Sequence, residues 1–209
     1  MTKIIAVTNQ KGGVGKTTTT VNLAASLAAV KKRVLLVDLD PQGNATMGSG
    51  INKGDLEKTV YNVLLEEVTV AQTRITSEKG KYDVLPANRE LAGAEIELVD
   101  MEEREMRLKK ELQTVAHEYD YILVDCPPAL NLLTLNGLCA ARSVMIPMQC
   151  EYYALEGLSD LVNTIRKVRE NLNPELEIEG LLRTMFDPRN SLAQQVSDQL
   201  QQHFGDKVY

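Results

Sequence analysis

The stretch Asn9-Gln10-Lys11-Gly12-Gly13-Val14-Gly15-Lys16-Thr17-Thr18 decides how the rest of the chain is interpreted. It follows an apolar run at residues 4–7, which predicts a buried strand, and it precedes an Ala- and Leu-rich stretch at residues 17–30, which predicts a helix. Glycines let consecutive backbone N–H groups converge on one anion, and the following helix adds the positive end of its dipole. The order of strand, loop and helix therefore predicts a phosphate-binding loop.

Two residues of this loop have the chemistry that a bound nucleotide requires. We expect the Lys16 ammonium group to lie on the β- and γ-phosphates and the Thr17 hydroxyl to be a ligand of the accompanying Mg²⁺. The loop departs from the usual P-loop pattern, because Gln10 stands where that pattern has its first glycine and Lys11 is an additional lysine. The alternative is an ordinary turn with two solvated lysines.

The variant Lys-Gly-Gly-Val-Gly-Lys-Thr-Thr resembles the deviant Walker A motif of the ParA/MinD group of ATPases. The resemblance implies that Lys11 reaches the nucleotide of the opposite protomer in an ATP-sandwich dimer, and that Lys11 and Lys16 both take part in catalysis. The ATP-binding residues that it implies are consecutive: Lys11, Gly12, Gly13, Val14, Gly15, Lys16, Thr17 and Thr18.

Two carboxylates follow the apolar run at residues 34–37, which predicts a strand buried on both faces. Asp38 and Asp40 share one side of an extended chain, near the carboxyl end of a parallel strand, where doubly wound sheets bind ligands. The resemblance makes Asp40 a metal-site residue that positions or polarises the attacking water, and Asp38 an organiser of the magnesium and phosphate shell. Helix- or turn-capping is the alternative for both. The tract through Gly50 predicts a loop that rearranges on nucleotide binding.

A third motif begins with the apolar run at residues 121–124, which predicts another buried strand, and continues as Asp125-Cys126-Pro127-Pro128. Such a strand presents Asp125 at its carboxyl end, so we expect this carboxylate to face the magnesium site through water. The motif is similar to the Walker B form of the same group. Many strands end in aspartate, so its significance depends on the lysine-glycine loop and on the Asp-x-Asp pair.

Periodicity predicts the remaining elements. Asp55 is expected to cap a helix that presents Leu56, Val60, Val63 and Leu64 on one side, and residues 68–76 have no clear assignment. A charged helix over 101–118 is expected to carry the i,i+4 pairs Glu103–Arg107 and Glu105–Lys109 on a solvated face. Strands are expected at 82–87, 143–147 and 177–185, and helices at 91–97, 155–168 and 191–204.

Two further residues have open alternatives. The stretch Gln149-Cys150-Glu151-Tyr152-Tyr153-Ala154-Leu155-Glu156-Gly157 resembles the ParA/Soj pattern, and Glu151 either answers the charge of Lys11, contacts the dimer partner, or is a helix-start carboxylate beside the macrodipole. In Soj-like members an arginine in the turn at 187–190 takes part in binding DNA without sequence preference. Arg189 is therefore the DNA-contact candidate, and an ordinary turn arginine is the alternative.

Composition limits the class of protein. The 209 residues suffice for one core and contain no Pro/Gly/Ser-rich linker, so residues 1–209 are expected to form a single domain. The net charge of −6 does not indicate a surface that is basic throughout, so any DNA contact has to come from a local patch, and the overall charge leaves the question of DNA binding open.

The cysteines, the apolar runs and the N-terminal sequence narrow the class further. Cys126, Cys139 and Cys150 form no Cys-x-x-Cys pair and have no nearby histidine, so they are expected to be small buried hydrophobic residues. No apolar stretch reaches the ~20 residues of a membrane span. The start, Met1-Thr2-Lys3-Ile4, lacks the length and cleavage region that a signal peptide requires, so the expected location is cytoplasmic, with no membrane partner.

These observations favour a doubly wound α/β protein with a mostly parallel sheet flanked by helices, of the P-loop NTPase class with a deviant Walker A motif. The resemblance implies a slow, Mg²⁺-dependent ATP hydrolase of chromosome or plasmid partition. Its ATP-bound homodimer would bind DNA non-specifically at the nucleoid, and a ParB-type centromere-binding partner would stimulate hydrolysis and release. Soj-like proteins usually continue beyond this length, so the chain is expected to be C-terminally truncated while entering another strand at 207–209.

Three alternatives share the phosphate chemistry. A MinD-like positioning ATPase would need a C-terminal amphipathic helix for the membrane. An electron-transfer ATPase like the nitrogenase iron protein would need cysteines placed to bridge an iron–sulfur cluster between subunits. A metabolic P-loop ligase would use the same phosphate chemistry as a partition ATPase, and only a substrate test distinguishes the two.

Overall fold

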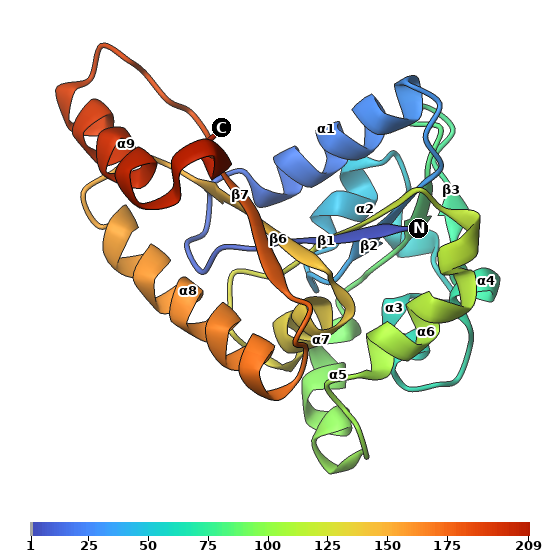
Figure 1. Cartoon of the computed structure of the whole chain (residues 1–209). Coiled ribbons are helices and arrows are strands. Elements are labelled where there is room, and N and C mark those ends of the chain that lie inside the picture. Colours follow the sequence, from blue (N-terminus) through green and yellow to red (C-terminus); the bar gives the residue numbers. More distant parts are fainter. Residues whose placement is uncertain (1) are drawn as a thin grey trace.

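The computed structural model describes residues 2–209, which fold around a seven-stranded sheet with the order β3-β4-β2-β5-β1-β6-β7 (Figure 1). Only β3 (Ile75–Thr76) runs antiparallel to its neighbour, β4 (Asp83–Leu85). The other neighbours are parallel. The predicted doubly wound, mostly parallel α/β fold is confirmed.

The centre of the sheet sets the position of the site. Strands β1 (Lys3–Val7), β2 (Val34–Asp38) and β5 (Tyr121–Asp125) are apolar runs whose residues are almost all buried, as expected for parallel strands covered on both faces. Their register pairs Asp125 with both Val7 and Asp38. The ends of β2 and β5 therefore place two carboxylates side by side at the carboxyl edge. Strands β6 (Ser143–Met148) and β7 (Glu177–Arg183) extend the sheet beyond β1.

Helices cover both faces of the sheet (Figure 1). On one face, α1 (Lys16–Ala29) and α2 (Asn44–Gly48) pack over the smaller core cluster, which contains Ala24 and Ala45. The larger cluster packs against the remaining helices, whose bounds are α3 (Val60–Leu64), α4 (Val70–Thr73), α5 (Leu91–Glu97), α6 (Arg107–Val115), α7 (Leu132–Ala140), α8 (Ala154–Asn171) and α9 (Ser191–Phe204).

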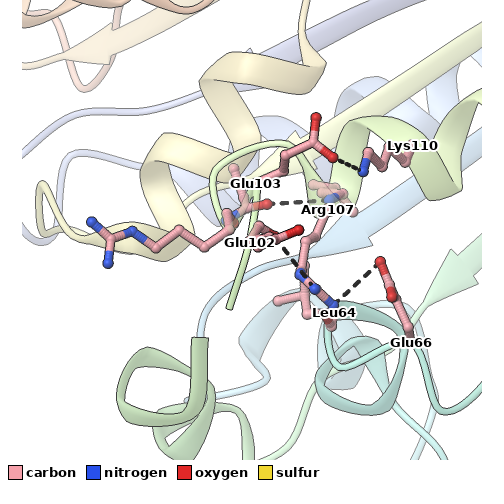
Figure 2. Close-up of polar contacts among 9 residues, drawn as sticks. Leu64, Glu66, Glu102, Glu103, Arg107 and Lys110 are labelled. Carbon is pink, nitrogen blue, oxygen red and sulfur yellow. Dashed lines mark hydrogen bonds and ion pairs between the residues drawn. The ribbon is translucent and has the colours of Figure 1, made fainter. Parts of the chain in front are cut away.

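The prediction of a charged helix over 101–118 was wrong in its extent, because α6 begins only at Arg107. Glu103 has a φ of +50° and lies outside the helix, where it pairs with Lys110 instead of Arg107 (Figure 2). The Arg107 guanidinium instead crosses to the end of α3, with Nη1 3.2 Å from the Glu66 carboxylate and 3.4 Å from the Leu64 carbonyl oxygen. The contact between Arg107 and α3 therefore replaces the expected i,i+4 pair.

Two other local predictions need correction. Asp55 caps no α-helix, because it ends a 3₁₀ turn, Lys53–Asp55, and α3 begins at Val60 with Thr59 and Asn62 as a capping box. The tract through Gly50 contains a helix, α2, and is not a loop throughout. The reason is long-range, since the buried Asp38 carboxylate accepts hydrogen bonds from the Thr46 N–H (2.8 Å) and hydroxyl (2.7 Å).

Several smaller expectations have clear outcomes. The unassigned residues 68–76 form α4 and β3. Val208 makes an isolated parallel bridge to Leu181 of β7, which agrees with a chain that enters another strand. The three cysteines are free and buried, as predicted. Among residues 2–209, no helix has the length and apolar character needed to cross a bilayer.

Candidate functional site

The loop between β1 and α1 is shaped to present backbone N–H groups. Gly13 and Gly15 have φ values of +74° and +87°, which side chains other than glycine rarely adopt. Within residues 2–209 no side chain caps α1, which leaves its first amides available to a ligand. The Lys16 Nζ donates a hydrogen bond to the Lys11 carbonyl oxygen at 3.1 Å, and this bond curls the loop over the start of the helix. An anion fits this arrangement of donors.

A cavity of about 790 Å³ opens above the loop, within the range that ligand pockets occupy. Of the eight predicted ATP-binding residues, six line it, whereas Lys11 and Val14 do not. Val14 is buried in the fold, and its carbonyl oxygen accepts a hydrogen bond from the Thr184 hydroxyl at 2.8 Å. The lining residues are Gly12, Gly13, Gly15, Lys16, Thr17, Thr18, Thr19, Asp40, Gln42, Asn44, Pro128, Leu182, Arg183, Thr184 and Met185.

One wall of the cavity was missed by sequence reasoning. Thr184 and Met185 follow β7 and line the cavity together with Asp40 and Pro128. The available signal was positional, because β7 is a parallel strand and ligands bind outside the carboxyl ends of such strands. No residue type in the stretch 182–185 distinguishes it from an ordinary strand end.

A small cluster of oxygen atoms lies beneath the loop. The Thr17 hydroxyl donates to Asp125 Oδ2 at 2.7 Å, and the Thr20 hydroxyl donates to Asp125 Oδ1 at 3.1 Å. Asp125 is fully buried and reaches the cavity through Thr17, as a carboxylate that acts on a metal through an intermediate oxygen should. Mg²⁺ takes one or two protein oxygens together with water and substrate phosphates, and Thr17 with Asp125 supplies such a set.

Burial changes the electrostatics of this cluster. Burial, together with the charge of the nearby Asp38 carboxylate, raises the pKa of Asp125 to about 7. Burial also lowers the pKa of the Lys16 ammonium group, against the attraction of Asp125 and Asp40. A buried anion and a buried cation both lack full solvation, so a ligand that brings Mg²⁺ and phosphate together relieves both.

We expect Asp125→Asn to stabilise the nucleotide-free protein at pH 8. The folded-state pKa of about 7 lies above the ordinary 3.8, so the folded parent holds more protons than the unfolded chain and loses stability as the pH rises between these values. Removing the charge should raise Tm by about 2–4 °C, the shift for about 1 kcal/mol in a domain of this size. Thermal scans at pH 8 and pH 5 measure it, and an equal or larger gain at pH 5 would contradict this explanation.

Asp38 and Asp40 have different surroundings. Asp38 is fully buried, holds α2 through Thr46, and accepts a hydrogen bond from the Asp40 N–H at 3.1 Å. Burial raises its pKa to about 6. Asp38 therefore holds α2 in the nucleotide-free protein, and its expected part in organising the magnesium and phosphate shell stays a prediction. Asp40 lines the cavity, and its carboxylate also accepts from the Gln42 N–H at 2.9 Å.

The Lys11 side chain lies outside its own cavity and forms an ion pair with Glu151, in the loop between β6 and α8. Of the three alternatives for Glu151, the structure supports the one in which its carboxylate pairs with the charge of Lys11. Gly12 has open space around it, because a Cβ built there meets no atom within 4 Å among the described residues. In the free protein the Lys11 side chain is therefore held by its own subunit, while Gly12 borders open space at the cavity.

Arg189 lies in the turn before α9, four residues beyond the cavity wall at Met185. Its side chain is 88% exposed and pairs with Asp187, with Nη2 2.8 Å from Oδ2. The guanidinium is accessible to a large ligand, but in the free protein its charge is partly balanced by its own turn.

The fold and this site define a P-loop nucleoside triphosphatase with a second lysine in its phosphate-binding loop. The sequence family described as an AAA domain matches residues 2–178. Over 209 residues the chain is 58% identical to the sporulation initiation inhibitor protein Soj of Bacillus subtilis, covering 83% of that protein. It is 53% identical to the chromosome partitioning protein ParA of Myxococcus xanthus, with 99% of this chain and 73% of that protein aligned. The chain therefore belongs to the ParA/Soj family of partitioning ATPases.

Solved structures agree with this assignment. A structure described as cobyrinic acid a,c-diamide synthase from Mycobacterium smegmatis, with bound ADP and magnesium, matches with a TM-score of 0.93 and 40% identity, over 98% of this chain and 83% of that one. A plasmid partition protein from Borrelia burgdorferi matches with a TM-score of 0.82 and 32% identity, over 99% of this chain and 87% of that one.

Proposed function

We propose that this protein is an ATP-dependent dimerising switch for chromosome or plasmid partition. The observation that carries the proposal is the direction of Lys11, which belongs to the phosphate-binding loop yet points out of its own cavity. We further propose that the chain forms one ATPase domain, which a single sheet with both faces covered supports.

The residues of the cavity would hold ATP and Mg²⁺ as follows. The loop amides and the Lys16 ammonium group bind the phosphates, while Thr17, backed by Asp125, offers an oxygen to the metal. Bound Mg²⁺ would supply charge neutralisation between the phosphates. Asp40 also lines the cavity, and its carboxylate would hold and orient the attacking water.

In the dimer, Lys11 supplies positive charge to the nucleotide of the other subunit, and the absence of a side chain at Gly12 allows the two loops to approach. Neither contact is available to one protomer alone, so ATP hydrolysis is slow until both sites are complete and a ParB-type partner stimulates it. Closure also brings two copies of Arg189 into one particle, and this multiplies weak contacts with DNA phosphates at the nucleoid.

We expect Gly12→Val to fold normally and bind ATP while failing to dimerise. A Cβ built at Gly12 meets no atom within 4 Å among the described residues, so we expect the fold to tolerate the larger side chain and the clash to arise when a second subunit approaches. Light scattering with Mg–ATPγS measures the mass, and calorimetry measures nucleotide affinity. A variant that still forms a nucleotide-dependent dimer would disprove the steric argument.

The DNA-binding step is tested by affinity for non-specific duplex DNA at several salt concentrations, with ATP, ADP and no nucleotide. Binding should require ATP and fall steeply with salt.

We expect Arg189→Glu to weaken DNA binding and to flatten the slope of log K against log salt by about 2, since a dimer has two such arginines and each phosphate contact contributes about 0.9. Arg33→Glu is the matched control, because Arg33 pairs with Asp120 at the amino edge of the sheet. An unchanged slope in the Arg189 variant would exclude this contact.

Observations on this chain bear on two of the three alternative functions, the electron-transfer ATPase and the metabolic ligase. All three cysteines lie buried within the described chain, which disfavours a cluster bridged between subunits as in the nitrogenase iron protein. ATP-dependent amide synthesis remains a second candidate, because the structural neighbour at 40% identity is described as a cobyrinic acid a,c-diamide synthase. ATP turnover that responds to cobyrinic acid with glutamine, and not to DNA with a ParB-type protein, would favour that candidate.

A further inference from the structure

The proposed dimer has to break the Lys11–Glu151 ion pair, because the Lys11 side chain cannot bind the nucleotide of a partner while it lies against Glu151. The Lys11 backbone is held at both ends, because its N–H donates to the Asn9 side-chain oxygen at 3.0 Å and its carbonyl oxygen accepts from Lys16 Nζ at 3.1 Å. Only its side chain is left to move. In the free protein that side chain lies against Glu151.

Glu151 is also held by its surroundings. Its N–H donates to the Gln149 carbonyl oxygen at 3.0 Å, and its own carbonyl oxygen accepts from the Ala154 N–H at the start of α8, also at 3.0 Å. The Asn9 side-chain amide bonds the Pro147 carbonyl oxygen at 2.8 Å, which ties the phosphate-binding loop to the end of β6. The two charged residues therefore extend from backbones that are fixed relative to each other.

We propose that Glu151 is a positioning residue that holds Lys11 on its own subunit until the nucleotide of a partner arrives. This inference rests on the proposed function, in which Lys11 contacts that nucleotide. Dimerisation exchanges the carboxylate of Glu151 for phosphate oxygens, which carry more negative charge. After hydrolysis and phosphate release, the Lys11 ammonium group pairs again with the Glu151 carboxylate of its own subunit, which favours opening of the dimer.

The Lys11–Glu151 ion pair is exposed, and an exposed ion pair is weak enough to break and form again, as a reversible restraint on Lys11 requires. The side chains of Lys11 and Glu151 are 46% and 53% exposed, and ion pairs of this kind contribute little to stability. Each dimer breaks two of them. Taking the middle of the range measured for exposed pairs, the two together weaken association about five-fold.

The test compares Glu151→Gln with Glu156→Gln, a variant with the same charge change at an exposed first-turn residue of α8. Sedimentation with Mg–ATPγS gives the dimer dissociation constant. We expect Glu151→Gln to tighten the dimer about five-fold and Glu156→Gln to change it by less than about two-fold. Glu151→Asp, which restores the carboxylate, should return the constant toward the parent value. A dimer that is unchanged or weakened by Glu151→Gln would overturn the proposal.

A second readout examines the free subunit and needs no dimer. Without nucleotide, a water-soluble succinimidyl ester acylates lysines, and peptide mass spectrometry gives the rate at each position. Lys11 should react faster in Glu151→Gln, while exposed Lys58 should not change. An unaltered Lys11 rate would refute the restraint itself. If the parent protein forms no dimer with Mg–ATPγS, the proposed function fails instead, and the acylation result still decides whether Glu151 restrains Lys11.

Discussion

Replacing Lys16 by alanine should lower the affinity for Mg–ATP by about 100-fold or more. The Lys16 ammonium group lies at the start of α1, lines the cavity, and has only the Lys11 carbonyl oxygen as its hydrogen-bond partner among the described residues. With ATP bound it would make at least two charge-assisted hydrogen bonds, and two such bonds at about 1.5 kcal/mol each correspond to a loss of this size. Titration calorimetry on the isolated protein measures the effect.

Lys11→Ala is the matched control for that experiment, because it removes the other lysine of the same loop. The Lys11 side chain points away from its own cavity, so the affinity of a single subunit for ATP should stay within about three-fold of the parent, the loss expected from one exposed charge. If both variants lost affinity equally, the different roles assigned to the two lysines would be incorrect. Unchanged affinity in Lys16→Ala would remove Lys16 from the phosphate site.

Asp40→Ala should lower the rate of ATP hydrolysis by about 10²–10⁴-fold, the contribution usual for a positioned group that handles the proton of the nucleophile. The carboxylate lines the cavity and is oriented by the Gln42 N–H, while the loop that binds phosphate lies on another element. ATP binding and dimer formation should therefore persist, and the ATP-bound dimer should become long-lived.

Single-turnover assays give the rate, and sedimentation gives the lifetime of the dimer. Asp55→Ala is the control, because Asp55 is an exposed carboxylate of the neighbouring 3₁₀ turn that does not line the cavity. Turnover at the parent rate in Asp40→Ala would mean that another residue orients the water.

Much of the fold follows from local sequence. The apolar runs at 4–7, 34–37 and 121–124 are the three central strands, because a parallel strand covered on both faces needs apolar residues at every position. Predictions failed where a distant contact decided the local structure. The α6 helix begins only at Arg107, after Glu103 with its positive φ, and Arg107 reaches the end of α3, while buried Asp38 binds Thr46 of α2.

The candidate site, like the fold, was predicted in part from the sequence and in part was not. The sequence predicted that Lys16, Thr17 and Asp40 would lie around one cavity, since their spacing relative to the strand ends carries that information. It could not predict that Thr184 would bond Val14, or that Asp38 would be turned into the fold, because both depend on the packing of segments far apart in the chain. The pairing of Lys11 with Glu151 was one of several alternatives until the structure placed the two side chains together.

The central claim is that Lys11 acts on the nucleotide of the other subunit, and mixing two inactive variants tests it most directly. Lys11→Ala and Asp40→Ala subunits with different tags are combined with ATP, and heterodimers are purified through both tags. One site of each heterodimer then has its own Asp40 and receives Lys11 from the partner. Our account predicts hydrolysis at about half the parent rate, since one of two symmetric sites is complete. Heterodimers with no more activity than either variant alone would show that Lys11 acts within its own subunit, and would contradict the account.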